Sequence, residues 1–254
     1  MPHVLAFANQ KGGVGKTTTT LNIGAMLAQK MAKVLIIDLD PQANLTRGLG
    51  INPSEVENSV YEVLLNADQG TEFATWQVEQ SLFVVPSTKT LAGATDALGG
   101  RPARETFLRR ALKNTHTQYD YILVDTPPNL GLLTANALVA ATAVIVPVQV
   151  HTYALQALPE LEDTVELITE LNANLHIGGI VCTMVQRSTT LSREVEQQLR
   201  EQYGELVFKT VIPLNTKLAE APAFGEPISI YAPGSQGAIA YAALTEELET
   251  RYAR

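Results

Sequence analysis

Two lysines flank a glycine-rich turn in the segment NQKGGVGKTTTT at residues 9–20. The apolar residues 4–8 before the turn suit a buried strand, and Lys16 and Thr17 open a helical pattern after it. Glycines in such a connection let backbone N–H groups converge on an anion at the helix N-terminus. Lys16 can then reach the β- and γ-phosphates of a nucleotide, and Thr17 can ligate Mg²⁺. The predicted phosphate-binding residues are Gly12, Gly13, Val14, Gly15, Lys16, Thr17 and Thr18.

Lys11 is the lysine that such a loop does not need. The ordinary pattern G-x-x-x-x-G-K-[ST] requires glycine where this chain has Gln10, so the loop is a variant with Lys11 inside it. A lysine from outside the cradle can neutralise charge that develops on a transferred phosphoryl group, as an arginine finger does. The alternative is a solvated surface charge.

Three aspartates end two apolar, strand-like runs. Asp38 and Asp40 lie in VLIIDLDPQ, and Asp125 lies in YDYILVDTPPNLG. Side chains at the carboxyl ends of parallel strands point into the crevice where ligands bind. Asp125 therefore suits the Walker B position, which holds Mg²⁺ through water, and Asp40 suits the orientation of an attacking water with support from Asp38. The alternative for each is an aspartate that caps the following helix.

Strand-like and helix-like segments alternate along the chain. The expected strands are residues 4–8, 33–39, 82–85, 121–125, 143–149, 177–185 and 206–212, and the expected helices are 16–31, 130–141, 154–171, 191–202 and 238–252. Continuous apolar strands are typical of a sheet covered on both faces. We therefore expect a single α/β domain over residues 1–254, with a doubly wound, mostly parallel twisted sheet and helices on both faces. Residues 61–66 suit a further short helix.

Composition narrows the class of protein. Hydrophobic residues make up 46% of the chain and the net charge is −8, which argues against general attraction to nucleic acid but leaves room for a local basic patch. The single cysteine, Cys182, lies in an apolar run and suits a buried thiol in a reducing cytoplasm. No apolar run reaches the roughly 20 residues of a membrane span, and no leader peptide is expected. Because only eight residues precede Asn9, no N-terminal helix-turn-helix is expected either.

Together, KGGVGKTT, IDLDPQ and VDTPP resemble the ParA/MinD group of deviant Walker ATPases. The segments LGLLTANALVAA, VIVPVQ, ALQALPEL, IPLNTKLAEAPAFG and GAIAYAALTEEL extend the resemblance to the ParA/Soj branch, which partitions plasmids and chromosomes. The resemblance covers nearly the whole chain. It implies a P-loop NTPase fold, ATP and Mg²⁺ as cofactors, and a slow ATPase that a ParB-like or other adaptor protein stimulates.

The resemblance also assigns roles to residues. Lys11 matches the signature lysine, which reaches across a homodimer to the phosphates of the partner's ATP, and Pro213 and Asn215 match residues that bury adenine. The ATP-bound dimer of such proteins binds DNA without sequence preference, so the protein is expected in the cytoplasm on the nucleoid. The matching DNA-binding candidates are Arg187, Arg193 and Lys217. Two positions depart from relatives that carry arginine there, Ser188 and Leu214.

Three other classes of protein share this type of loop. A ParA-like protein that positions a different cellular cargo would have the same residues, so the sequence leaves that alternative open. A MinD-like membrane ATPase needs a C-terminal amphipathic helix with a basic face, whereas Glu246, Glu247 and Glu249 make this one acidic. A nitrogenase iron protein needs paired cysteines for its cluster, and Cys182 stands alone.

Overall fold

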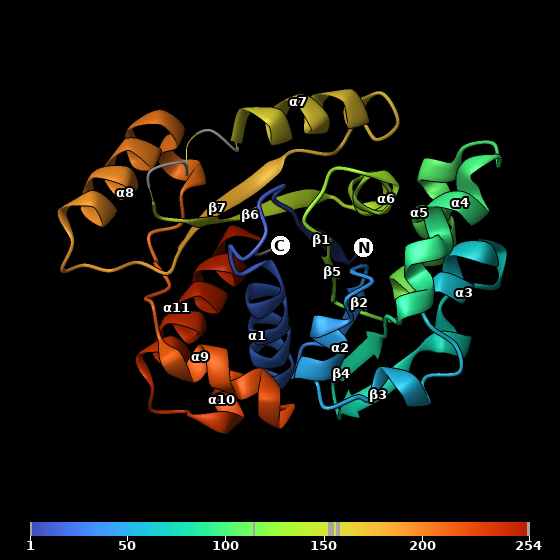
Figure 1. The fold of residues 1–254 in the computed structure, drawn as a ribbon, viewed down its shortest axis with the longest axis horizontal. Helices are drawn as coiled ribbons and strands as arrows, with labels where there is room; N and C mark the ends of the chain where they lie inside the picture. The colour runs from blue at the N-terminus through green and yellow to red at the C-terminus, as the bar shows by residue number, and fades with distance from the viewer. Residues whose placement is uncertain (1, 114, 152–154, 156–157, 253–254) are drawn as a thin grey trace.

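Seven strands form one sheet at the centre of the molecule (Figure 1). This computed structural model describes residues 2–113, 115–151, 155 and 158–252. The strand order is β3-β4-β2-β5-β1-β6-β7, and every neighbouring pair is parallel except β3 and β4. The strands are β1 (His3–Phe7), β2 (Val34–Asp38), β3 (Trp76–Glu79), β4 (Leu82–Val85), β5 (Tyr121–Asp125), β6 (Ala143–Gln149) and β7 (Ile177–Thr183).

Helices cover both faces of the sheet. The α-helices are α1 (Lys16–Gln29), α2 (Asn44–Gly48), α3 (Val60–Leu65), α4 (Ala94–Gly99), α5 (Phe107–Leu112), α6 (Leu132–Ala140), α7 (Leu158–Thr169), α8 (Thr190–Tyr203), α9 (Thr216–Glu220), α10 (Ile228–Tyr231) and α11 (Gln236–Arg251). Short 3₁₀ turns are Pro53–Glu55, Ala67–Gln69, Glu72–Ala74, Lys89–Gly93, Arg104–Thr106, Thr115–Thr117, Gly204–Leu206 and Ala221–Phe224.

The core divides into two layers, one on each face. In β1, Val4 and Ala6 pack with side chains of α3 to α8, whereas Leu5 and Phe7 pack with α1, α2, α10 and α11. Alternate residues of a strand point to opposite faces, so a strand covered on both sides must be apolar at every position. The doubly wound α/β fold predicted from the sequence is confirmed.

Most of the helices and strands predicted from the sequence are present in the structure at the predicted positions. The strands 82–85, 121–125 and 143–149 have the predicted bounds, and the helices around 61–66, 16–31, 130–141, 191–202 and 238–252 exist with ends shifted by one or two residues. The helix predicted over 154–171 is found as α7, and residues 154, 156 and 157 lie outside the described part of the chain. The short edge strand β3 was not predicted, because it is half-exposed and lacks an apolar run.

The strand predicted over residues 206–212 is wrong. This segment follows β7 through two isolated bridges, Ile180 to Val207 and Val185 to Pro213, with backbone hydrogen bonds from Phe208 to Ile180 and from Ile212 to Cys182. Between these two bonds, the backbone N–H groups of Lys209 and Thr210 donate to the Glu247 carboxylate of α11, at 2.7 and 2.9 Å. An apolar sequence therefore lies along the sheet edge without forming a ladder. Cys182 in β7 is buried as predicted, and burial raises the pKa of its thiol to about 12.

No described helix combines the length and the hydropathy needed to cross a membrane.

A close backbone approach fixes the end of α2, the helix that carries part of the site described below. Gly225 has φ +68°, and a Cβ there would lie 2.6 Å from Gly50 Cα. We expect Gly225→Ala to lower the free energy of unfolding by about 1–3 kcal/mol, because both the backbone conformation and the contact become strained. Urea unfolding measures the change. Gly234→Ala is the matched control, since a Cβ there meets nothing within 4 Å. If both variants lowered the free energy of unfolding equally, the close approach of Gly225 to Gly50 would not be the cause.

Candidate nucleotide-binding site

The glycine-rich loop connects β1 to α1 at the carboxyl edge of the sheet. Gly13 and Gly15 have φ +74° and +88°, a conformation that side-chain-bearing residues rarely adopt. Gly15 is the N-cap of α1, and no side chain caps this helix. The first N–H groups of α1 and the positive end of its dipole therefore face the loop, where an anion can accept them.

Lys16 lies under this loop and is 6% exposed. Its Nζ donates to the carbonyl oxygens of Asn9 at 2.9 Å and Lys11 at 3.1 Å. Burial lowers the pKa of Lys16, while the nearby charges of Asp125 and Asp40 oppose that shift. Neutral carbonyls are weak partners for a buried ammonium, so a phosphate in the loop would be a better one.

Asp125 ends β5 and is fully buried. Its carboxylate accepts a hydrogen bond from Thr17 Oγ1 at 2.7 Å. Burial, and then the charge of Asp38, raise the pKa of Asp125 well above its ordinary value, while Thr17 and Lys16 oppose that shift. A hydroxyl beside a buried carboxylate fits Mg²⁺, which proteins hold through one or two oxygen ligands while nucleotide phosphates and water supply the rest. No group of three or more His, Cys, Asp or Glu side chains that could hold a metal ion is found among the described residues.

Asp38, Thr46, Ser87 and Asp40 form a closed hydrogen-bond ring, hereafter the Asp38–Asp40 ring. Asp38 Oδ2 accepts from Thr46 N at 2.9 Å and Thr46 Oγ1 at 2.7 Å, and Asp38 Oδ1 accepts from Asp40 N at 3.1 Å. Ser87 N donates to Thr46 Oγ1 at 2.9 Å, and Ser87 Oγ donates to the Asp40 carbonyl at 2.7 Å. All four residues are buried, and burial raises the pKa of Asp38 to about 6 against the pull of its hydrogen bonds. The ring holds the backbone of Asp40 in place.

Lys11 faces its own chain in this structure. Its Nζ contacts His151 Nε2, beyond the end of β6, and its backbone N–H donates to Asn9 Oδ1 at 2.9 Å. Burial and the neighbouring Lys11 charge lower the pKa of His151. Sequence reasoning missed His151, because it lies 140 positions from Lys11 and belongs to no motif. A Cβ at Gly12 would meet Pro128 Cβ at 3.6 Å, which is an ordinary contact. A single copy of the chain therefore has space for a small side chain at position 12.

A cavity of about 190 Å³ adjoins the loop on the other side. Pro213 and Asn215, predicted to bury adenine, line it together with Gly15 and Tyr241. Thr183 also lines it and donates from Oγ1 to the Val14 carbonyl at 2.8 Å, which ties the loop to β7. Sequence reasoning missed Thr183 and Tyr241, since neither belongs to a motif.

The three DNA-binding candidates lie on two elements. Arg187 precedes α8 and Arg193 is in its first turns; both side chains are exposed, and the described residues give neither an ion pair. Lys217 of α9 instead pairs with Glu220 at 2.8 Å and lies over the Tyr231 ring. The positive charge of Lys217 is therefore partly neutralised by Glu220 of the same chain.

The chain is similar to known proteins over nearly its whole length. The family model described as AAA domain matches residues 2–177. The chain is 44% identical over 249 residues to the sporulation initiation inhibitor protein Soj of Bacillus subtilis, covering 98% of each. It is 47% identical to the chromosome-partitioning ATPase Soj of Thermus thermophilus, covering 97% of this chain and 95% of that one.

Among solved structures, a Mycobacterium smegmatis protein described as cobyrinic acid a,c-diamide synthase, with bound ATP analog and magnesium, superposes with a TM-score of 0.86. It is 37% identical, and the match covers 99% of this chain and 96% of that chain. The chain belongs to the ParA/Soj family of P-loop ATPases. Nucleotide and magnesium binding are properties of this fold.

The Asp38–Asp40 ring predicts a large effect of losing one hydroxyl. Thr46→Val keeps the shape of the side chain but removes one of the three donors to the buried Asp38 carboxylate and leaves the buried Ser87 N–H without its acceptor. We expect a loss of about 2–4 kcal/mol in the free energy of unfolding, and about 1 kcal/mol for Thr46→Ser, which keeps the hydroxyl. Denaturant unfolding of both variants measures this. Thr250→Val removes an exposed helical hydroxyl and serves as control; a Thr46→Val as stable as that control would refute the ring's contribution.

Proposed function

We propose that this chain is an ATP-dependent dimerising ATPase of DNA partition, acting on a chromosome or a plasmid. The ATP-bound dimer binds DNA without sequence preference, and partner-stimulated hydrolysis releases it. The observation that carries the proposal is the convergence of Lys16, the Thr17–Asp125 pair and the Asp38–Asp40 ring at one edge of the sheet. The support for partition is 41–47% identity to chromosome-partitioning proteins over nearly the full chain.

In this proposal each loop residue has a separate task. The N–H groups of residues 12–18 and the Lys16 ammonium hold the phosphates, and Pro213 and Asn215 flank the base. Thr17 and, through water, Asp125 hold Mg²⁺, which neutralises phosphate charge when bound. Asp40 orients the attacking water, and Asp38 supports Asp40 by accepting its backbone N–H.

Lys11 acts in trans. In one copy of the chain its ammonium contacts only a histidine among the described residues, at the edge where the phosphates would lie. Two such cationic loops repel each other unless triphosphate lies between them, so dimerisation depends on ATP. Hydrolysis removes part of the anionic charge that holds the two copies together.

The proposed binding surface for DNA consists of Arg187, Arg193 and Lys217. Arg187 and Arg193 are exposed and available to phosphates, and Lys217 would have to leave Glu220. A ParB-like or other adaptor stimulates turnover, and the protein works in the cytoplasm on the nucleoid as a single ATPase domain. Positioning of a different cargo would use the same cycle with another adaptor.

A membrane role is less well supported. In α11 the residues Tyr241, Leu244 and Leu248 are buried against the body of the protein. On its other side Glu247 binds backbone N–H groups, and Glu249 contacts Lys30. The apolar side of this helix is already packed against the protein, and its acidic outer side would be repelled by an anionic bilayer.

Two substitutions separate nucleotide binding from hydrolysis. We expect Lys16→Ala to lose ATP binding, and Asp40→Ala to bind ATP yet hydrolyse it at least about tenfold more slowly, since it removes the group that orients water. Isothermal titration and a phosphate-release assay measure the two properties. Asp96→Ala, an exposed acid in α4, is the control. Normal turnover by Asp40→Ala would remove Asp40 from the mechanism.

DNA binding is tested with the Asp40→Ala protein, which should remain in its ATP state. We expect binding to unrelated DNA sequences with ATP but not with ADP, weakening steeply as salt rises. Adding Lys11→Ala should abolish it together with ATP-dependent dimerisation, and adding Arg187→Glu should weaken it without affecting the dimer. Lys113→Glu is the charge control, because it follows α5, far from α8 (Figure 1). Equal binding in all nucleotide states would contradict the switch.

A further inference from the structure

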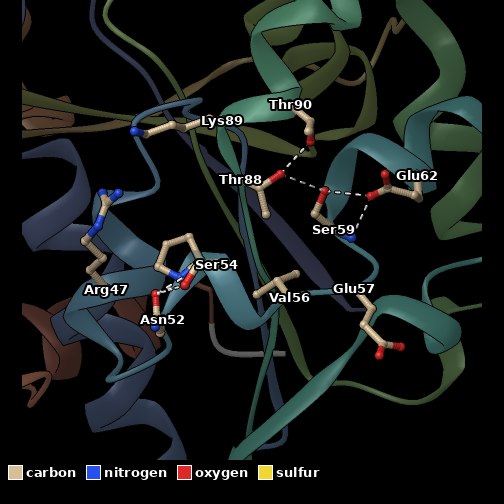
Figure 2. A pocket seen from close by; sticks show the side chains of 11 residues that line it. Arg47, Asn52, Ser54, Val56, Glu57, Ser59, Glu62, Thr88, Lys89 and Thr90 are labelled. Carbon is tan, nitrogen blue, oxygen red and sulfur yellow. Dashed lines mark hydrogen bonds between the residues drawn. The ribbon is translucent and has the colours of Figure 1, made fainter.

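A second cavity lies outside the nucleotide site, between α2, the N-terminal end of α3 and the segment after β4. It measures about 440 Å³, and Figure 2 shows Arg47 and Lys89 on one side of it and Thr88 near its middle. We call it the Arg47 pocket. Its volume falls in the range of about 300–1,000 Å³ typical of small-molecule sites.

The two cations of the Arg47 pocket lack a charged partner. Among the described residues, the Lys89 ammonium has no hydrogen bond and no ion pair. The Arg47 guanidinium donates through Nη1 alone, to the backbone carbonyls of Gln42 and Ala43. In a chain of net charge −8, two cations lining one pocket without a carboxylate partner are an unusual concentration of positive charge.

The two carboxylates of the pocket do not neutralise these cations. Glu62 accepts from the N–H and the hydroxyl of Ser59, each at 2.7 Å, and so completes the capping box of α3. Glu57 points away from the cations at the opposite side of the view in Figure 2. The end of the pocket near Arg47 and Lys89 is therefore positive.

Hydroxyl groups line the wall between the cations and α3. Thr88 Oγ1 lies 2.6 Å from Thr90 Oγ1 and donates to Ser59 Oγ at 3.4 Å. A hydroxyl proton rotates freely, so these groups can turn to donate to an oxyanion. Guanidinium, ammonium and hydroxyl donors together are the groups that bind phosphate and carboxylate in proteins.

The walls of the Arg47 pocket are continuous with the ring that holds Asp40. Arg47 follows Thr46, and Thr88 follows Ser87, so each wall residue is bonded to a ring member. Arg47 also donates to the Gln42 carbonyl, in the segment just after Asp40. A ligand bound between Arg47 and Lys89 would therefore lie against the backbone segments that carry Thr46 and Ser87, and Ser87 holds the Asp40 carbonyl.

We propose that the Arg47 pocket binds an anionic group, a phosphate or a carboxylate, and that its occupant changes the rate of ATP hydrolysis by moving Asp40. The second half rests on the proposed role of Asp40, whereas the first half does not. The anion has two possible sources, a free small molecule or an acidic side chain of a partner protein. Either source would make the pocket a regulatory site of the ATPase.

Binding is tested on the full chain saturated with a non-hydrolysable ATP analogue and Mg²⁺, so that the phosphate loop, including its γ-phosphate position, is already filled. The probes are inorganic phosphate, citrate and a hexaglutamate peptide, at constant ionic strength, with backbone amide NMR shifts of residues 47 and 87–90 as the readout. We expect saturable binding of at least one probe, weakened about tenfold by Lys89→Ala and unchanged by Lys113→Ala. Preference for phosphate or citrate identifies a small molecule, and preference for the peptide identifies a partner side chain.

No saturable binding, or equal binding by wild type and Lys89→Ala, would overturn the site. Coupling is tested by ATP turnover with and without the bound probe. We expect kcat to change at least about twofold with KM nearly constant, and the change to vanish in Lys89→Ala but persist in Lys113→Ala. Binding that leaves kcat unchanged overturns the coupling. A chain that hydrolyses no ATP at all refutes the proposed function, and the binding titration still decides whether the site exists.

Discussion

Two carboxylates stand side by side at the centre of the sheet edge, and much of the surrounding structure compensates for them. Asp38 and Asp125 are register partners on the neighbouring strands β2 and β5, and both are fully buried. Burying like charges together is costly unless donors and cations surround them. Thr46 supplies two donors to Asp38, Thr17 supplies one to Asp125, and the Lys16 ammonium is close enough to act on Asp125. A strand pair that served stability alone would have apolar residues here.

This requirement links loops that are distant in sequence. Asp38 needs Thr46 from the start of α2, and Thr46 in turn receives the N–H of Ser87, which follows β4. Asp125 needs Thr17 at the start of α1. The two sets of hydrogen bonds meet where Asp38 and Asp125 lie side by side on neighbouring strands. Buried groups cannot exchange a lost partner for water, so losing a donor to either carboxylate is costly.

The sequence predicts this unit only in part. Lys16, Asp38 and Asp125 are identified because their types and their places after apolar strands indicate one chemistry. Thr46 and Ser87 are not, since hydroxyl residues are common and their hydrogen bond joins positions 41 apart. The six parallel strands follow from continuous apolar runs, whereas the failed strand over 206–212 has the same apolar signal. The pairing is interrupted at Lys209 and Thr210, whose backbone N–H groups donate to Glu247 of α11, a contact that no local pattern predicts.

The partners of the two lysines suit the proposed exchange for nucleotide phosphates. Lys16 donates to backbone carbonyls, and Lys11 contacts the His151 imidazole. These partners hold the ammonium groups near the edge of the sheet but balance none of their charge, so each contact is weaker than one to a phosphate. In the proposed ATP complex, exchanging them for phosphate oxygens would gain free energy at both positions. Because Gly13 and Gly15 already hold the backbone of the loop, this exchange would require two side chains to turn rather than a loop to fold.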